Sequence, residues 1–304
     1  MALLDGASTA DAEGMTKIVV GVDGSASSQD ALRWAVAEAK LRNVPLEALM
    51  AWGYLDQHHV PAEAHYFEPD YDEADARAAL GQYVLEALGS DAASGVELRP
   101  SVDLPARALL EAAEDAALLV VGARGRGGFA SLLLGSVSQK VLHHATCPAA
   151  VIRGQEPIPP SGEARIIVGV DGSLHADAAL RWAIAEGRLR DSSVEVVHAW
   201  HMPFVAPYPY VSAELDGSPF EKDARDIVDG AIRRAKATAD DRVSTVISLS
   251  GPSSLLLETA KGADLIVVGS RGLSPAKAAV LGSVSHQVTL HATCPVVVIP
   301  EEST

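Results

Sequence analysis

The chain has 304 residues, enough for two domains of ordinary size, and its 24 Lys and Arg against 40 Asp and Glu give a formal net charge of −16. This acidic balance opposes binding to nucleic acids and to anionic lipid surfaces, because both are negatively charged. The apolar runs are far shorter than the ~20 residues of a membrane-spanning helix, and the first residues carry Asp and Glu where a secretion signal needs positive charge. We therefore expect a cytoplasmic protein without a nucleic-acid or membrane partner.

Strands and helices are predicted to alternate along the first half. Residues 17–23 form a short β-branched run typical of a buried strand, and Ser25 stands where the N-cap of the next helix belongs. The other expected elements are strands at 45–52, 96–103, 117–122 and 147–153 and helices near 72–89, 105–115 and 135–144. Continuous Val and Ile runs between helices predict a parallel sheet that is covered on both faces.

The second half repeats the first. Its expected strands are at 165–171, 193–200, 242–249, 264–269 and 294–300, with helices between them. Residues 21–42 align without a gap with 169–190, and residues 122–125, 135–138 and 144–152 align with 269–272, 282–285 and 291–299. A period this long indicates a duplicated domain. The predicted fold class is α/β, with two tandem doubly wound, Rossmann-like, five-stranded parallel-sheet domains.

The domain limits follow from the segment between the two copies. Residues 154–163 have the Pro, Gly and polar character of a linker. We predict a flexible tail at 1–15, a first domain at 16–153, the linker, and a second domain at 164–304.

A glycine pattern follows the fourth strand of each half. In the first half Gly122, Gly125 and Gly135-Ser136 are separated by two and by nine residues, and Gly269, Gly272 and Gly282-Ser283 repeat this spacing. Glycines let a backbone turn tightly and bring N–H groups close to a phosphate, and the helix that follows favours anions at its N-terminus. Neither a Walker A motif nor a GxGxxG after the first strand is present. Asp23 and Asp171 end the first strands, where they could cap the following helix or contact a ligand.

Together, the G-2x-G-9x-G-S spacing, the GVDGS first strand and the closing TCPVVVI strand resemble the ATP-binding class of universal stress proteins. The resemblance covers nearly the whole chain and extends to the tandem form of actinobacteria. It implies an adenine nucleotide alpha hydrolase-like fold and up to two ATP molecules per chain, with Mg²⁺. It assigns the phosphates and ribose to the glycine loop, the nucleoside to the aspartate, and the adenine to the backbone near the end of the second strand.

Carried over position by position, the resemblance predicts one set of ligand-binding residues in each half. In the first half the set is Gly21, Asp23, Ala51, Gly122, Ala123, Arg124, Gly125, Arg126, Gly127, Gly128, Gly135, Ser136 and Val137. In the second half the set is Gly169, Asp171, Ala199, Gly269, Ser270, Arg271, Gly272, Gly282, Ser283 and Val284. Arg126-Gly127-Gly128 of the first loop is replaced by Leu273-Ser274-Pro275 in the second, and proline removes an N–H. Our hypothesis is that the second site binds more weakly.

The last strands, CPAAVI and CPVVVI, are short apolar edges of the kind that pair with another strand, so we expect the two halves to form a pseudo-dimer within the chain. A homodimer of chains is the weaker expectation. Cys147 and Cys294 occupy the same position of the repeat and are expected to be buried thiols, and no CxxC or His/Cys cluster indicates a metal site.

Three functions are open at this point. The first is a nucleotide-dependent stress-response protein that acts on an unknown regulatory protein partner, without catalytic residues. The second is a slow ATPase or phosphoryl-transfer enzyme, although no positioned base beside the glycine loop is evident. The third is a nucleotide-free dimerisation module, which the two intact glycine patterns disfavour.

Overall fold

The computed structural model describes residues 17–52, 72–125, 133–154, 164–201, 218–273 and 281–300. The elements of the first half are β1 (Ile18–Gly21), α1 (Ala26–Arg42), β2 (Leu46–Trp52), α2 (Glu73–Ala93), β3 (Val96–Val102), α3 (Pro105–Ala112), β4 (Leu118–Gly122), α4 (Ser136–His144) and β5 (Ala149–Ile152). Those of the second half are β6 (Arg165–Gly169), α5 (Leu174–Arg190), β7 (Ser193–Trp200), α6 (Ser218–Arg234), the 3₁₀ turn η2 (Ala239–Asp241), β8 (Val243–Leu249), α7 (Pro252–Thr259), β9 (Leu265–Gly269), α8 (Ser283–His291) and β10 (Val296–Ile299). The alternation of strands and helices expected in both halves is confirmed. The predicted tail and nearly all of the predicted linker lie outside the described residues.

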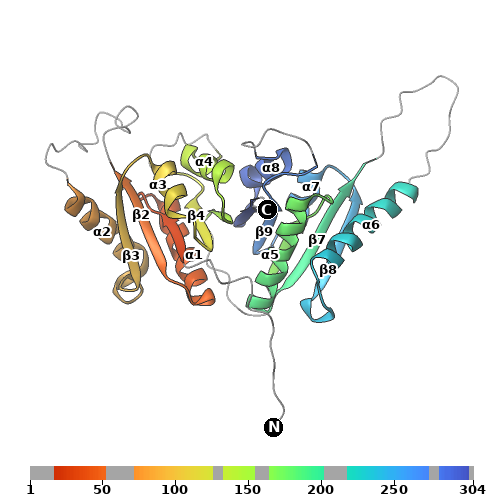
Figure 1. The fold of residues 1–304 in the computed structure, drawn as a ribbon, viewed down its shortest axis with the longest axis horizontal. Helices are drawn as coiled ribbons and strands as arrows, with labels where there is room; N and C mark the ends of the chain where they lie inside the picture. The colour runs from red at the N-terminus through yellow and green to blue at the C-terminus, as the bar shows by residue number, and fades with distance from the viewer. Residues whose placement is uncertain are drawn as a thin grey trace, which may run out of the picture.

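The strands form one sheet in the order β3-β2-β1-β4-β5-β10-β9-β6-β7-β8. Within each half, neighbouring strands are parallel. The halves join where β5 and β10 pair antiparallel, with Ala150 opposite Val297. Figure 1 shows the halves side by side, with β3 and β8 toward the two outer sides. The prediction that the last strands pair within the chain is therefore confirmed.

The helices that follow the first strand of each half, α1 and α5, have the same two ends. Ser25 caps α1, since its Oγ accepts a hydrogen bond from the N–H of Ser28 at 3.2 Å, and Ser173 caps α5 in the same way. Both helices end at a residue in the left-handed conformation, Asn43 and Asp191, each with φ of 53°. The predicted N-cap is confirmed, and its counterpart in the second half repeats it.

Two hydrophobic layers cover the sheet. One contains buried residues of α1, α2, α5 and α6, including the fully buried Trp34, and the other contains buried residues of α3, α4, α7 and α8. Each layer draws on both halves, so the core continues across the β5–β10 junction. Burying a large apolar side chain such as the fully buried Leu32 stabilises the fold by about 2 kcal/mol.

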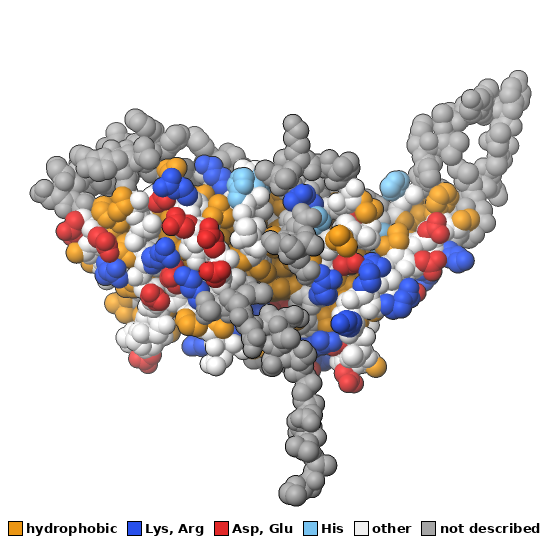
Figure 2. Space-filling model, in the orientation of Figure 1, with side chains coloured by type: hydrophobic (Ala, Val, Ile, Leu, Met, Phe, Trp, Pro, Cys, Tyr) orange, Lys and Arg blue, Asp and Glu red, His pale blue; other side chains and the backbone are white. Residues whose placement is uncertain are grey.

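The outer surface is charged and mixed. On the face drawn in Figure 2, acidic and basic side chains mix over the helices of the first half, while basic side chains gather over the lower parts of α5 and α6. Among the described residues no helix combines the length and apolar character that crossing a membrane requires.

Candidate functional site

The strand order places the ends of β1 and β4 next to each other in the first half, and the ends of β6 and β9 in the second. From β1 the chain continues to β2 on one side, and from β4 it continues to β5 on the other. This reversal is the point at which open parallel sheets bind ligands, beyond the carboxyl ends of the strands. Asp23 and Gly122 lie at this point, as do Asp171 and Gly269.

Each aspartate holds the turn that leads into the next helix. Oδ1 of Asp23 accepts hydrogen bonds from the backbone N–H of Ser25 at 2.9 Å and from its Oγ at 2.6 Å. Oδ1 of Asp171 accepts one from the N–H of Ser173 at 2.9 Å. The structure therefore supports the helix-turn role that the sequence left open for these residues.

The other carboxylate oxygen of each aspartate faces the glycine loop. A Cβ added to Gly125 would overlap Oδ2 of Asp23, and one added to Gly272 would overlap Oδ2 of Asp171. In the second half the N–H of Leu273 also donates to Oδ2 of Asp171 at 3.1 Å. Any side chain at Gly125 or Gly272 would displace either the carboxylate or the loop.

Gly122 and Gly269 have a different reason to be glycine. A Cβ on Gly122 would lie 2.6 Å from the backbone carbonyl of Ser27, and one on Gly269 would lie 2.8 Å from the backbone carbonyl carbon of His175. The ends of β4 and β9 thus pack directly against the first turns of α1 and α5. The glycine spacing predicted a role in phosphate binding for Gly122 and Gly269, but close packing alone already requires glycine at both positions.

The N-termini of α4 and α8 complete the site. Gly135 and Gly282 are the N-caps, and their own N–H groups donate to the carbonyls of Ala123 and Ser270, each at 2.7 Å. No side chain caps either helix within the described part of the chain. An N-terminus without a side-chain cap leaves backbone N–H groups for an anion, and the helix dipole adds to the attraction.

The remaining predicted residues lie around this edge. Ser136 and Ser283 are exposed at the first helical positions, and Val137 and Val284 are half-buried behind them. Ala51 and Ala199 are half-buried near the ends of β2 and β7, at the same edge of the sheet. Arg124 is exposed in the first loop, and Arg271 is half-buried in the second. Gly21 and Gly169 instead pack against α3 and α7, where an added Cβ would lie 3.1 Å from Leu109 and 3.0 Å from Leu256. Arg126, Gly127 and Gly128 lie outside the described residues.

Several serines of the site were not predicted from the sequence. Oγ of Ser27 accepts a hydrogen bond from the N–H of Arg124 at 3.3 Å, which ties the first loop to α1. Oγ of Ser138 donates to the carbonyl of Gly122 at 2.7 Å, and Ser285 repeats this contact with Gly269 at 2.5 Å. The duplicated GSVS motif contains Ser138 and Ser285, so the repeat carried the signal for them. Ser27 had no such signal, because His175 replaces it in the second half.

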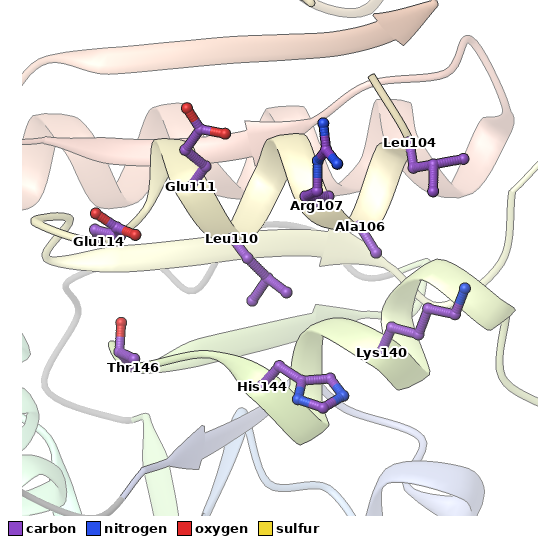
Figure 3. A pocket seen from close by; sticks show the side chains of 9 residues that line it. All are labelled: Leu104, Ala106, Arg107, Leu110, Glu111, Glu114, Lys140, His144 and Thr146. Carbon is purple, nitrogen blue, oxygen red and sulfur yellow. The ribbon is translucent and has the colours of Figure 1, made fainter. Parts of the chain in front are cut away.

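A separate groove runs between α3 and α4. It is lined by Leu104, Ala106, Arg107, Leu110, Glu111, Glu114, Lys140, His144 and Thr146. Figure 3 shows Leu110 pointing from α3 toward α4, with Lys140 and His144 on the facing helix. None of these residues belongs to the set predicted to bind ligand, so this groove is not the candidate site.

The sequence model of the universal stress protein family matches residues 15–153 and again residues 164–300. The chain belongs to the universal stress protein family. Universal stress protein Rv2005c of Mycobacterium tuberculosis is 31% identical over 294 residues, which cover 92% of this chain and 96% of that protein. Universal stress protein Rv2623 of the same species is 31% identical over 298 residues, which cover 94% and 97%.

Solved structures agree on the fold of this universal stress protein. A universal stress protein of Archaeoglobus fulgidus aligns with a TM-score of 0.63 at 21% identity, over 94% of this chain and 96% of that one. A universal stress protein named as putative, from Pseudomonas aeruginosa, aligns with a TM-score of 0.64 at 17% identity, over 95% of each chain. The α/β fold with doubly wound domains is thus the fold of the family.

Proposed function

We propose that each half of the chain binds ATP where the aspartate and the glycine loop meet, and that the protein is a nucleotide-dependent regulator of a stress response. The observation that carries this proposal is the contact between Asp23 and Gly125, which Asp171 and Gly272 repeat. In each half this contact lies at the reversal point of the sheet, beside a helix N-terminus that receives no cap from a described side chain.

The chemistry of this edge suits a nucleoside polyphosphate. The N-termini of α4 and α8, with the exposed hydroxyls of Ser136 and Ser283, offer donors to phosphate oxygens. Arg124 and Arg271 add positive charge, and the aspartates are acceptors suited to sugar hydroxyls. The resemblance to the ATP-binding class of the family supports ATP as the nucleotide, with Mg²⁺ accompanying its phosphates.

The same geometry favours binding over fast catalysis. The carboxylates that contact the loops, Asp23 and Asp171, each hold a helix turn with one oxygen. Because that oxygen is engaged with the turn, we assign these carboxylates to the support of the turn and to ligand contact, and not to the activation of a water. A slow ATPase or phosphoryl-transfer enzyme is the alternative, and a turnover above about 1 s⁻¹, within the range of ordinary enzymes, would favour it.

The proposal includes domain limits at 16–153 and 164–304, a cytoplasmic location, and a regulatory protein partner that recognises the nucleotide-bound state. The pairing of β5 with β10 supports a function in which the two sites belong to one unit. A homodimer of such chains is part of the proposal.

Calorimetric titration with Mg²⁺ and ATP tests the binding function. We expect about two ATP per chain, and about one after either Gly125→Val or Gly272→Val, since each added side chain would overlap an aspartate. The double variant should bind none. Gly95→Val is the matched control, because the nearest atom to an added Cβ there would be the carbonyl oxygen of Ala92 at 4.0 Å. Full binding by the double variant would contradict the proposed site.

A further inference from the structure

Arg153 connects the first glycine loop to the second half of the chain. It follows β5 directly, and its Nη2 donates hydrogen bonds to the carbonyl of Leu133 at 2.9 Å and to the carbonyl of Thr289 at 2.5 Å. Leu133 lies two residues before Gly135, the N-cap of α4. Thr289 lies in the last turn of α8, in the other half.

The contact with Thr289 is favourable for a specific reason. The last carbonyls of a helix lack partners within the helix, and the dipole makes this end negative. The guanidinium of Arg153 therefore caps α8 from outside its own half. Burial, and secondarily the positive charge of Arg124 in the first loop, lower the pKa of Arg153. Nε of Arg153 is buried and has no hydrogen-bond partner within the described residues.

The second half has no arginine at the position that aligns with Arg153. The repeat aligns Arg153, the residue after Ile152, with Pro300, the residue after Ile299. Proline has neither a charge nor an N–H, so position 300 cannot donate the matching hydrogen bonds to the first half. The first loop is thus linked to the opposite half through Arg153, a side chain that the second half lacks at the aligned position.

We propose that Arg153 transmits nucleotide occupancy of the first loop to α8, and through α8 to the second loop at Gly282. This inference rests on the proposed function. A bound polyphosphate would offset the repulsion between Arg124 and Arg153 and would fix the segment that carries the Leu133 carbonyl. Both hydrogen bonds of Arg153 would then be stronger when nucleotide is bound than when it is absent. Coupling between two sites requires such a difference in interaction free energy between the two states. Because coupling is reciprocal, ATP in the second loop would also raise the affinity of the first.

Amide hydrogen exchange of the full chain tests this link. The second site is first blocked by Gly272→Val, so that ATP fills only the first loop, and exchange of residues 286–292 is compared with and without ATP. We expect ATP to slow this exchange severalfold when Arg153 is present. In R153Q, calorimetry should still show ATP in the first loop, while the slowing should be lost.

Arg165→Gln is the matched control. Arg165 likewise donates to the carbonyl of the last residue of α7, Thr259, and to that of Lys261 just beyond it, but within its own half. Its removal should leave the slowing at 286–292 intact. If R153Q does not fold, R153M replaces it, because the methionine keeps an apolar stem of similar length and removes both donors.

Three results would overturn the inference. The first is that ATP slows amide exchange of residues 286–292 equally in R153Q and in the chain with Arg153. The second is that ATP does not slow this exchange although calorimetry shows the first loop filled. The third is complete loss of ATP binding in R153Q, since Arg153 would then bind the ligand directly. Absence of binding heat with both loops intact would instead overturn the proposed function, and the inference with it.

Discussion

Arg190, at the end of α5, donates a hydrogen bond to the carboxylate of Glu38 in α1, across the junction of the two halves. Both side chains are at most 2% exposed. Nε of Arg190 also donates to Glu186 at 2.5 Å, and Arg42 pairs with Glu186 and lies 3.5 Å from Glu38. Since residues 38 and 42 align with 186 and 190, the four form a pseudo-symmetric cluster. Burial, followed by the charge of Glu186, raises the pKa of Glu38.

Removing Glu38 should strongly destabilise the chain. Glu38→Ala leaves the buried guanidinium of Arg190 with one carboxylate fewer, and breaking a buried ion pair costs about 3–5 kcal/mol. The free energy of unfolding, from denaturant titration, measures the loss. Glu221→Ala is the control, because its pair with Arg225 is exposed and should contribute at most about 1 kcal/mol. Similar losses in the two variants would refute the cluster's role in joining the halves.

A second prediction concerns acid stability. Arg188 donates two hydrogen bonds to Asp241, at 2.6 and 2.9 Å, and holds the pKa of this carboxyl well below its usual range. A lowered native pKa stabilises the fold above the unfolded value of about 3.9, and this stabilisation is lost as the pH falls through the native value. Asp241→Asn should therefore cost about 2 kcal/mol at pH 7, and the difference from the wild type should shrink toward pH 3.

Denaturant titrations at several pH values measure this difference. The adjacent, exposed Asp240 supplies the control, since Asp240→Asn should change the free energy of unfolding by less than about 0.5 kcal/mol. A gap between wild type and Asp241→Asn that stays constant from pH 7 to pH 3 would rule out the titration of Asp241 as its source.

The sequence predicted those parts of the site that depend on strand ends. The resemblance grouped Asp23 and Gly125 in one ligand-binding set, and the two lie together because parallel strands bring their carboxyl ends to one edge. The packing of Gly122 against Ser27 was missed, since it depends on how closely α1 approaches β4. The spacing of the glycines is the same whether packing or a ligand requires them, so the pattern alone could not separate the two reasons.

The contacts between the halves were beyond sequence reasoning for another reason. The aligned repeat showed Glu38 and Arg42 recurring as Glu186 and Arg190, but this i,i+4 spacing also suits a pair exposed on one helix. Only the rotation imposed by the antiparallel β5–β10 pair brings α1 and α5 together. Arg153 depends on the same rotation for its contact with Thr289.

The two cysteines should be unreactive in the folded protein. Burial raises the pKa of Cys147 to about 11 and that of Cys294 to about 11. Because the thiolate is the reactive form, labelling with a thiol reagent at pH 8 should be slower than for an exposed thiol by about a hundredfold or more, and rapid only after unfolding. Thr146→Cys, at the exposed neighbouring position, should label at once. Rapid labelling of the wild-type chain would show that one thiol is accessible.

The last prediction is that the two loops differ in affinity. The N–H of Leu273 already donates to Asp171, and the sequence places proline at position 275 where the first loop has Gly128. Each lost hydrogen bond to a charged phosphate costs about 1.5 kcal/mol or more, which is about tenfold in the dissociation constant. Gly125→Val, which leaves the second site, should therefore bind ATP at least about tenfold more weakly than Gly272→Val. Adding Pro275→Gly to Gly125→Val restores one N–H and should recover part of the affinity. Equal dissociation constants for the two single variants would show that the glycine spacing alone sets the affinity.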